Sequence, residues 1–319
     1  MQVIESCDST PVQGGLVATI GMFDGVHLGH LTLLNAVKRE AQQRSLHSAV
    51  VTFRQHPRTI LHPDDNIKML MTVQARLDAL SSQDIDYAVL LDFTTGLSAL
   101  GALDFMRLLH DRYGVRVLLM GYNHRFGHDR SSSFAQYVQW GVEAGIEVIK
   151  APEYLGRYAP VSSSIIRNLI TAGKVDDAMR CMGRPYTLAG HVVHGFRNGR
   201  GMGFPTANVG QIAPDALIPH NGAYAVMVTL QGKQWQGMVN VGYRPTLGES
   251  DRLSIEVNIF DFDGDVYGEP ITLEFIQFLR LEFKMVSVDE LRHQLELDRD
   301  KARAILTAYT TPNTLTSNP

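Results

Sequence analysis

The sequence predicts an α/β fold in its first half, followed by an antiparallel β-barrel and a C-terminal helix. In the first half, short apolar runs alternate with stretches of helical apolar spacing, which is typical of a parallel, doubly wound sheet. In the second half, short strands at close spacing are separated by Gly, Asn and Asp turns, which favours a barrel. At 319 residues the chain is long enough for about two domains.

Five runs in the first half have the nearly continuous apolar character of strands that are covered on both faces. These predicted strands are Leu16–Ile20, Ser48–Phe53, Tyr87–Asp92, Val115–Met120 and Ile146–Lys150. The predicted helices are Leu31–Arg44, Val73–Ser81, Leu103–Tyr113, Phe134–Ala144, Ser162–Ala172 and Val175–Met182. Because ligands bind at the carboxyl ends of strands in such sheets, the loops beginning near Gly21, Arg54, Phe93 and Gly121 are the expected site.

Beyond residue 184 the predicted secondary structure changes from alternating strands and helices to short, closely spaced strands. The predicted strands of this half are Thr187–Phe196, Ala223–Leu230, Gln234–Val241, Leu253–Phe260 and Ile271–Phe278. An amphipathic helix is expected at Val288–Leu306, and a polar tail follows it. We therefore expect domains at residues 1–183 and 184–309, with a tail at 310–319.

The composition indicates an ordinary soluble globular protein, with 45% hydrophobic and 19% charged residues. A net charge of -4 gives no global attraction for nucleic acid. The two cysteines, Cys7 and Cys181, are too few for a disulfide framework or a metal cluster, which suits a reducing compartment. No signal peptide and no membrane-length apolar run is visible, so we expect a cytoplasmic protein without membrane or nucleic-acid partners.

The first predicted strand leads into the segment Gly21–His30, which reads Gly-Met-Phe-Asp-Gly-Val-His-Leu-Gly-His. The helix that follows offers free amide donors at its start, and Gly25 and Gly29 let a phosphate approach the backbone. His27 and His30 are three residues apart, so both rings can face one side and donate hydrogen bonds to phosphate oxygens. The alternatives are a plain glycine-rich turn with two polar cap residues, or a zinc site, which lacks further ligands at a known spacing.

This segment resembles the signature of the bacterial bifunctional riboflavin kinase/FMN adenylyltransferases, also called FAD synthetases. Their Rossmann-like nucleotidylyltransferase domain places a His-x-Gly-His element at the ATP phosphates. Three further stretches of this half resemble the family, namely Thr52–Pro57, Gly121–Gly127 and Ser162–Arg167. The resemblance covers nearly the whole chain apart from the tail. Ser164 stands where the family more often has Thr, and Leu31 stands where Gln is common.

The resemblance implies that the phosphate of FMN attacks the α-phosphorus of ATP, giving FAD and pyrophosphate. Because this nucleophile is already an anion, catalysis needs positioning and charge stabilisation rather than a general base. Those roles fall to His27, His30, Asn123 and Arg167. The other residues expected at the phosphates are Gly21, Phe23, Asp24, Gly25, Gly29, Arg125, Ser162, Ser163 and Ser164. Taken alone, an Asn in a turn, an isolated Arg or serines at a helix start have ordinary structural uses.

The barrel half has a phosphate loop of its own. The segment Gly199–Asn208 reads Gly-Arg-Gly-Met-Gly-Phe-Pro-Thr-Ala-Asn and resembles the riboflavin kinase signature. The glycines, Gly199, Gly201 and Gly203, allow a loop that wraps phosphates through its amides. Thr206 and Asn208 offer hard oxygen ligands for Mg²⁺. The alternative is a Gly/Pro turn between strands. Since the chain has no Gly-x-x-x-x-Gly-Lys-[Ser/Thr] loop, its ATP sites must be built from these other loops.

Glu256 lies on the polar face of the predicted strand Leu253–Phe260, whose apolar residues alternate with polar ones. Such a Glu is usually solvated surface. The resemblance implies instead that Glu256 is the general base that removes the proton from the 5′-hydroxyl of riboflavin before it attacks the γ-phosphate. Arg280 and Phe283 resemble family positions near the flavin.

The sequence thus predicts a bifunctional enzyme that uses ATP, riboflavin, FMN and Mg²⁺, as a monomer or weak homo-oligomer. Two other hypotheses stay open. The first is an adenylate-forming ligase related to aminoacyl-tRNA synthetases, although no Lys-Met-Ser-Lys-Ser-like loop or anticodon-binding domain is visible. The second is an adenylyltransferase whose barrel is a flavin sensor without kinase activity. The presence of Thr206, Asn208 and Glu256, the residues expected for the kinase reaction, argues against it.

Overall fold

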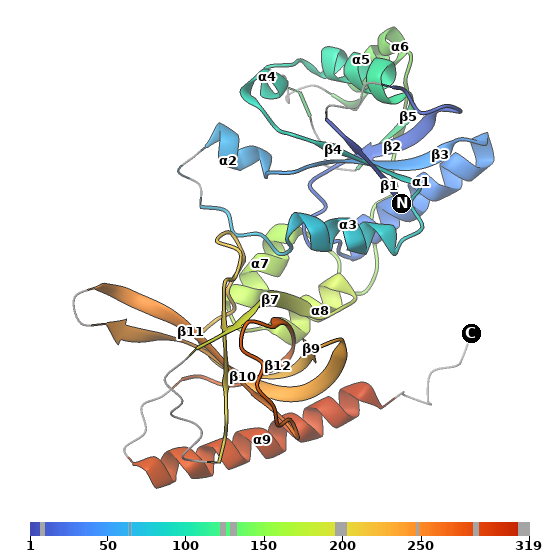
Figure 1. Ribbon diagram of the computed structural model, residues 1–319. Coiled ribbons are helices and arrows are strands. Elements are labelled where there is room, and N and C mark those ends of the chain that lie inside the picture. The colour runs from blue at the N-terminus through green and yellow to red at the C-terminus, as the bar shows by residue number, and fades with distance from the viewer. Residues whose placement is uncertain are drawn as a thin grey trace. The chain divides into compact units, whose positions relative to one another are not determined.

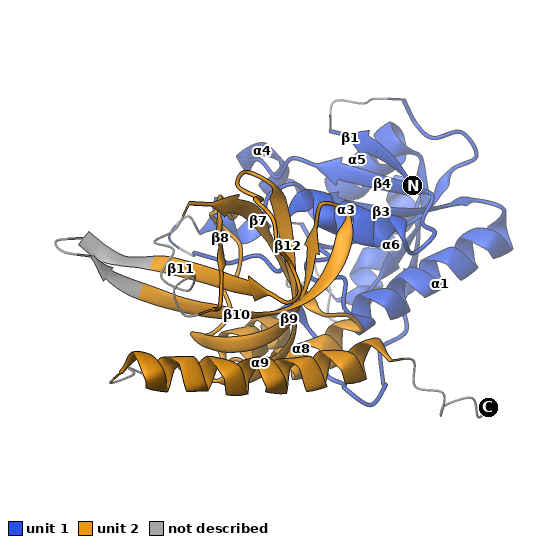
Figure 2. Cartoon of the chain, turned by 60° about the horizontal axis from the view of Figure 1, so that its bottom comes forward, with its two compact units in different colours: residues 1–163 blue, residues 164–319 orange. Residues whose placement is uncertain are grey.

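The structure of the protein is a computed structural model (Figure 1). It describes residues 1–6, 10–62, 64, 66–121, 126–127, 133–194, 203–246, 249–282 and 287–311, with the backbone alone at 244–246 and 249–252. The chain divides into two compact units, Met1–Ser163 and Ser164–Pro319, which Figure 2 shows in separate colours. Within the described ranges, no helix has the length and apolar character needed to cross a membrane.

Unit 1 is built on a six-stranded parallel sheet with the strand order β1-β4-β3-β2-β5-β6. Its strands are β1 (Gln2–Glu5), β2 (Leu16–Ile20), β3 (His47–Phe53), β4 (Tyr87–Leu91), β5 (Val115–Met120) and β6 (Glu147–Lys150). The five predicted strands are confirmed. The sequence analysis missed β1, because this edge strand has only four residues and its first two are exposed, so it lacks a buried apolar run.

Helices cover both faces of this sheet, which confirms the doubly wound prediction. They are α1 (Leu28–Arg44), α2 (Pro57–Leu61), α3 (Val73–Ser81), α4 (Thr95–Ser98), α5 (Ala102–Tyr113) and α6 (Phe134–Ala144). Leu34 of α1 and Leu80 of α3 pack with Val50 on one face. Leu109 of α5 and Tyr137 of α6 pack with Val51 on the other face, as the alternation along β3 requires. The sequence missed α2 and α4, which are a single turn each and bury no residue.

Unit 2 is a closed barrel with the strand order β10-β11-β8-β7-β12-β9, in which every neighbouring pair is antiparallel. Its strands are β7 (Tyr186–Val193), β8 (Ala207–Gly210), β9 (Gly222–Leu230), β10 (Lys233–Thr246), β11 (Glu249–Ile259) and β12 (Pro270–Arg280). The predicted barrel is confirmed. The missed strand β8 is short and mostly half-exposed, yet it closes the barrel by pairing with both β7 and β11.

Three helices accompany the barrel. α7 (Ser163–Thr171) and α8 (Val175–Met182) precede it, and α9 (Val288–Thr310) follows it. Ala302 and Leu306 of α9 pack against Ala225 of β9 and Ile276 of β12, and Figure 2 shows α9 running along the barrel. An ion pair between Arg280 and Asp298 also links β12 to α9, with a closest N–O distance of 2.8 Å.

Candidate functional sites

The turn after β2 holds its shape through unusual backbone conformations. Phe23 and Val26 have φ values of 51° and 36°, which are strained for residues with side chains. Both side chains are almost fully buried, at 1% and 2% exposure, and this packing stabilises the strained conformation. Gly25 has φ 83°, and a Cβ at this position would lie 2.7 Å from Leu70 Cδ1, so only glycine fits.

The two histidines of this turn cap helix α1 and each other. His27 is the N-cap residue, and its Nδ1 accepts a hydrogen bond from the amide of His30 at 3.3 Å. His30 Nδ1 accepts from the amide of His27, also at 3.3 Å. This capping box starts the helix at Leu28, three residues before the predicted start at Leu31. The rings stack at a centroid distance of 3.7 Å, with Gly29 close beneath His27, where a Cβ would lie 3.2 Å from the ring.

The caps decide what the two rings offer to a ligand. Because each Nδ1 accepts an amide hydrogen, the neutral rings carry their proton on Nε2. Burial, followed by the neighbouring His27, holds the pKa of His30 well below its ordinary value of 6.5. His30 is therefore a neutral donor at physiological pH. The stacked pair presents two N–H donors beside a helix N-terminus. This arrangement suits a phosphate group on which negative charge builds up during the reaction.

Asp24 anchors the turn rather than facing solvent. Its carboxylate is 1% exposed and accepts hydrogen bonds from the amides of Leu70, at 3.0 Å, and Met71, at 3.1 Å. Its main-chain carbonyl accepts a hydrogen bond from Ser163 Oγ at 2.8 Å. The acidic residue of the motif thus ties together the turn, the segment before α3 and the last residue of unit 1.

An apolar hollow lies at the carboxyl edge of the same sheet. Its lining comes from the ends of β2 and β3, from the segments after β4 and β5, and from the nearby helices. These residues are Ile20, Phe53, Pro57, Phe93, Leu97, Ser98, Leu100, Phe105, Phe126 and Gly127. Phe53 and Phe93 form an edge-to-face pair with a centroid distance of 5.4 Å. The hollow has the aromatic character that suits a flat ring system.

The remaining predicted residues of the first site divide between the units and the undescribed positions. Ser162 and Ser163 belong to unit 1, whereas Ser164 and Arg167 lie on α7 in unit 2. Asn123 and Arg125 lie outside the described residues. The structure therefore brings together Gly21, Phe23, Asp24, Gly25, His27, Gly29, His30 and Ser163, while the roles of the other residues stay predictions.

In the barrel, Glu256 lies at the centre of a polar row that crosses three adjacent strands. On β11 it stands opposite Asn208 of β8 and Asn240 of β10. Its carboxylate accepts hydrogen bonds from Ser254 Oγ at 3.0 Å and from Thr206 Oγ1 at 3.4 Å. The structure thus joins Thr206, Asn208 and Glu256, which the sequence had predicted from two separate stretches. Their hydroxyl, amide and carboxylate oxygens fit the ligands that Mg²⁺ prefers.

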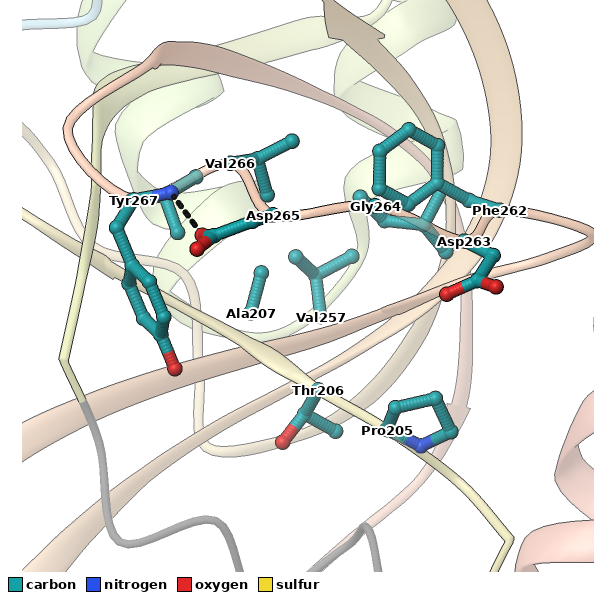
Figure 3. Close-up of a pocket in the computed structure, with 12 residues that line it drawn as sticks. Pro205, Thr206, Ala207, Val257, Phe262, Asp263, Gly264, Asp265, Val266 and Tyr267 are labelled. Carbon is teal, nitrogen blue, oxygen red and sulfur yellow. Dashed lines mark hydrogen bonds between the residues drawn. The ribbon is translucent and has the colours of Figure 1, made fainter.

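A pocket of about 410 Å³ opens beside Thr206 (Figure 3). The loop from Phe262 to Tyr267 forms one side of it, and Pro205, Thr206 and Ala207 lie across from that loop. Asp265 accepts a hydrogen bond from the amide of Tyr267 at 3.2 Å, which stabilises the loop. The ring of His194 lies over that of Tyr267 with a centroid distance of 3.9 Å. The size of the pocket, its aromatic rim and its position next to Thr206 suit a nucleotide.

Sequence reasoning missed most of this pocket. The stretch Phe262–Tyr267 read as a turn between strands, and only its unusual density of acidic residues gave a signal. Ser254 was also missed, although its place two residues before Glu256 puts both side chains on one face of the strand.

Arg280 uses its guanidinium within the barrel unit. Nε donates to Asp298 Oδ2 at 2.8 Å, and Nη1 donates to the carbonyl of Leu281 at 3.0 Å. Gly203 has φ 80°, and an added Cβ would meet no described residue within 4 Å, so the backbone conformation is what favours glycine here. Gly199, Gly201 and Phe283 lie outside the described residues.

Comparison with known proteins agrees with the two-part organisation. The FAD synthetase family model matches residues 9–165, and the riboflavin kinase family model matches residues 182–306. A bifunctional riboflavin kinase/FMN adenylyltransferase of Pseudomonas fluorescens is 36% identical over 92% of this chain and 94% of its own length. The corresponding protein of Listeria monocytogenes is 34% identical over 90% of this chain and 91% of its own length.

A solved structure extends this similarity to the fold. It is a crystal structure described as a macrolide-efflux protein from Streptococcus pneumoniae, with 30% sequence identity and a TM-score of 0.86 over 95% of this chain and 99% of that one. Together with the two family models and the relatives that span nearly the full length, it leaves one assignment. The chain belongs to the bifunctional riboflavin kinase/FMN adenylyltransferase family.

Proposed function

We propose that the protein converts riboflavin to FMN and then FMN to FAD, with one ATP consumed in each step and pyrophosphate released in the second. The observation that carries this proposal is that the two units hold chemically different sites. The turn of unit 1 offers neutral hydrogen-bond donors. The barrel offers a carboxylate held among hydroxyl and amide groups.

Adenylyl transfer belongs to the Gly21–His30 turn. The phosphate of FMN attacks the α-phosphorus of ATP, and the bond from that phosphorus to the oxygen shared with the β-phosphorus breaks, so that pyrophosphate leaves. His27 and His30 donate from Nε2 to the oxygens on which negative charge increases, and the start of α1 adds its partial positive charge. Gly21, Gly25 and Gly29 permit close approach, while Phe23 and Asp24 hold the turn in shape. The apolar hollow of unit 1 takes the flat ring of FMN.

Riboflavin phosphorylation belongs to the barrel. The nucleophile is the neutral 5′-hydroxyl of riboflavin, so Glu256 accepts its proton as the hydroxyl oxygen attacks the γ-phosphorus of ATP. The bond from that phosphorus to the oxygen shared with the β-phosphorus breaks, and ADP leaves. Ser254 and Thr206 orient the carboxylate. The pocket beside Thr206 takes the nucleotide. Thr206 and Asn208 would hold Mg²⁺, which would offset the negative charge of the triphosphate.

Further residues extend these sites in our proposal. Asn123, Arg125, Ser162, Ser163, Ser164 and Arg167 contribute to the phosphates of the adenylyl-transfer site, and Gly199, Gly201 and Gly203 contribute to those of the kinase site. Arg280 and Phe283 serve the flavin in the barrel, with Arg280 acting from its fixed position beside Asp298.

We also propose where the activities divide along the chain and where the protein works. The FMN adenylyltransferase part is residues 1–183 and the riboflavin kinase part is residues 184–309. The enzyme works in the cytoplasm as a monomer or weak homo-oligomer. Neither the ligase nor the flavin-sensor hypothesis has an observation in its favour, since family similarity extends through both halves.

Isotope labelling tests the proposed sequence of reactions. The protein is incubated with riboflavin, Mg²⁺ and ATP labelled with ³²P at either the γ- or the α-phosphorus, and the flavins are separated by chromatography. The γ-label should enter FMN and remain in FAD, whereas the α-label should enter FAD alone. Label from α-ATP in FMN, or FAD without γ-label, would refute the proposal.

A further inference from the structure

Several buried polar groups of unit 1 belong to the Gly21–His30 turn, to the strand ends beside it and to α3. Thr19 and Thr52, near the ends of β2 and β3, are fully buried, as is Arg76 of α3. Asp24 in the turn is 1% exposed. Buried polar groups cost free energy unless they are paired or do something that apolar groups cannot. Arg76 is the most costly of them, because a guanidinium is always charged near neutral pH.

Arg76 is held by little hydrogen bonding for a buried cation. Its Nη2 donates to the carbonyl oxygen of Phe53, the last residue of β3. Its Nε and Nη1 have no hydrogen-bond partner among the residues that the structure describes. Loss of hydration lowers the pKa of Arg76 to about 10, and the negative charge of Asp24 opposes that fall. Asp24 is therefore the acidic group whose charge acts on this cation.

Asp24 and Arg76 belong to one closed set of contacts. The Asp24 carboxylate binds the amides of Leu70 and Met71. The next residue is Thr72, the N-cap of α3. Its carbonyl oxygen accepts a hydrogen bond from the amide of Arg76 at 3.0 Å. From α3, the Arg76 side chain returns to the end of β3. The turn, α3 and the sheet edge are thus tied together, with one negative and one positive charge at the two key positions.

We propose that Arg76 is a positioning residue for adenylyl transfer: its cation balances the buried Asp24 carboxylate and so keeps the Gly21–His30 turn in shape for a triphosphate. Without that cation, the buried Asp24 carboxylate loses the positive charge that acts on it, and buried carboxylates that lose a charge partner are strongly destabilising. Arg76 acts through Asp24 and does not touch the substrate. The inference rests on the assignment of adenylyl transfer to this turn.

A double-mutant cycle tests the proposal, with Arg76→Met, Asp24→Asn and the two combined. The readouts are KM for ATP and kcat of FAD formation from FMN. Thermal unfolding reports on the folding of unit 1, and the riboflavin kinase activity reports on the barrel unit. Arg76→Met should raise KM for ATP about tenfold or lower kcat by a similar factor, with kinase activity retained. Arg76→Lys, which keeps the charge, should stay within about threefold of the wild type.

The combined variant separates charge balance from packing. Asn in place of Asp24 removes the uncompensated charge, so Asp24→Asn should restore most of the activity lost in Arg76→Met. Arg107→Met, which removes an exposed arginine of α5, is the matched control and should change neither activity. If Arg76→Met does not fold, Arg76→Lys and the combined variant still decide the question.

Two results would overturn the proposal. The first is wild-type KM and kcat in Arg76→Met, and the second is a combined variant whose loss equals the product of the two single losses. His30→Ala distinguishes this failure from failure of the site assignment. If His30→Ala still makes FAD normally, the turn is not the adenylyl-transfer site and the Arg76 proposal falls with it. If His30→Ala is inactive while Arg76→Met behaves as wild type, only the Arg76 proposal falls.

Discussion

In the proposed function, the turn of unit 1 and the polar row of the barrel serve two reactions with opposite chemical requirements. In the turn, the reactive side chains are committed to the backbone: each imidazole uses Nδ1 to cap the helix and keeps only an Nε2–H to donate. In the barrel, the proposed base is a hydrogen-bond acceptor: the Glu256 carboxylate accepts from the hydroxyls of Thr206 and Ser254. The difference follows the nucleophiles: the phosphate of FMN needs no deprotonation, whereas the hydroxyl of riboflavin does.

The largest effect is expected for Glu256→Gln. Loss of a general base typically costs about 10²–10⁴ in rate, so riboflavin phosphorylation should fall by that factor. Supplied FMN should still become FAD at the wild-type rate. Steady-state assays with riboflavin and with FMN as separate substrates measure both.

Glu274→Gln provides the matched control, since it makes the same change on β12 outside the polar row. It should leave the kinase within about twofold of the wild type. Wild-type kinase activity in Glu256→Gln would show that Glu256 is not the general base of riboflavin phosphorylation.

The next effect concerns His30. In His30→Ala, FAD formation from FMN should fall by about 10²–10³, the usual cost of one transition-state donor, with phosphorylation of riboflavin unchanged. Because Ala also removes half of the capping box, a stability loss of about 0.5–2 kcal/mol should accompany it.

His30→Gln separates these two losses. Gln at the third helical position can still reach back to the N-cap amide, so the cap should survive while the imidazole donor is lost. A melting temperature near that of the wild type together with low FAD formation is expected. Full FAD formation in His30→Gln would show that the imidazole is needed for the cap and not for the reaction.

A smaller effect should separate two glycines that both have positive φ. Gly25→Ala meets Leu70 Cδ1 at 2.7 Å in addition to the strain of φ 83°, and should cost about 2–3 kcal/mol. At Gly203, φ is 80° and no described residue lies within 4 Å of an added Cβ, so Gly203→Ala should cost about 1 kcal/mol. Thermal unfolding gives the stabilities, and the activities should respond separately, with FAD formation affected in the first variant and FMN formation in the second.

Equal destabilisation by the two substitutions would contradict this reasoning. It would mean that backbone strain alone, and not the close approach of Leu70, accounts for glycine at position 25.

The smallest expected effect is a pH dependence of stability. The pKa of His30 is lowered in the folded protein, whereas in the unfolded chain it lies near 6.5. Below pH 6.5 the unfolded state therefore binds more protons, so the contribution of His30 to stability is complete above that pH and is lost as the pH falls below it. Thermal unfolding between pH 5 and 8 should show a steeper decline for the wild type than for His30→Gln. Parallel curves would contradict the lowered pKa.

The sequence predicted the long elements well, because strands buried on both faces and amphipathic helices leave strong periodic patterns. It missed β1 and β8, whose four residues each are too short for a pattern and which form only when neighbouring strands are present. The Gly21–His30 motif predicted a turn between the first predicted strand and a helix, and the structure has this turn between β2 and α1. Its role as the adenylyl-transfer site stays a prediction.

The roles of individual side chains were harder to predict, because they depend on contacts between distant segments. Nothing in the sequence shows that the two imidazoles cap each other, or that Asp24 binds amides 46 and 47 residues further along the chain. An arginine in an amphipathic helix reads as surface, yet Arg76 is fully buried. Arg280 read as a residue near the flavin, and its guanidinium pairs with Asp298, which only the packing of α9 on the barrel brings close.

The central claim is that two separate sites, one without and one with a base, act in sequence. Mixing two inactive variants tests it most directly. Neither His30→Ala nor Glu256→Gln alone should make appreciable FAD from riboflavin, since the first stops at FMN and the second does not reach it. An equimolar mixture supplied with riboflavin and MgATP should make FAD, because FMN released by one variant serves the other. A mixture that makes no FAD, although each variant retains its other activity, would contradict two independent sites.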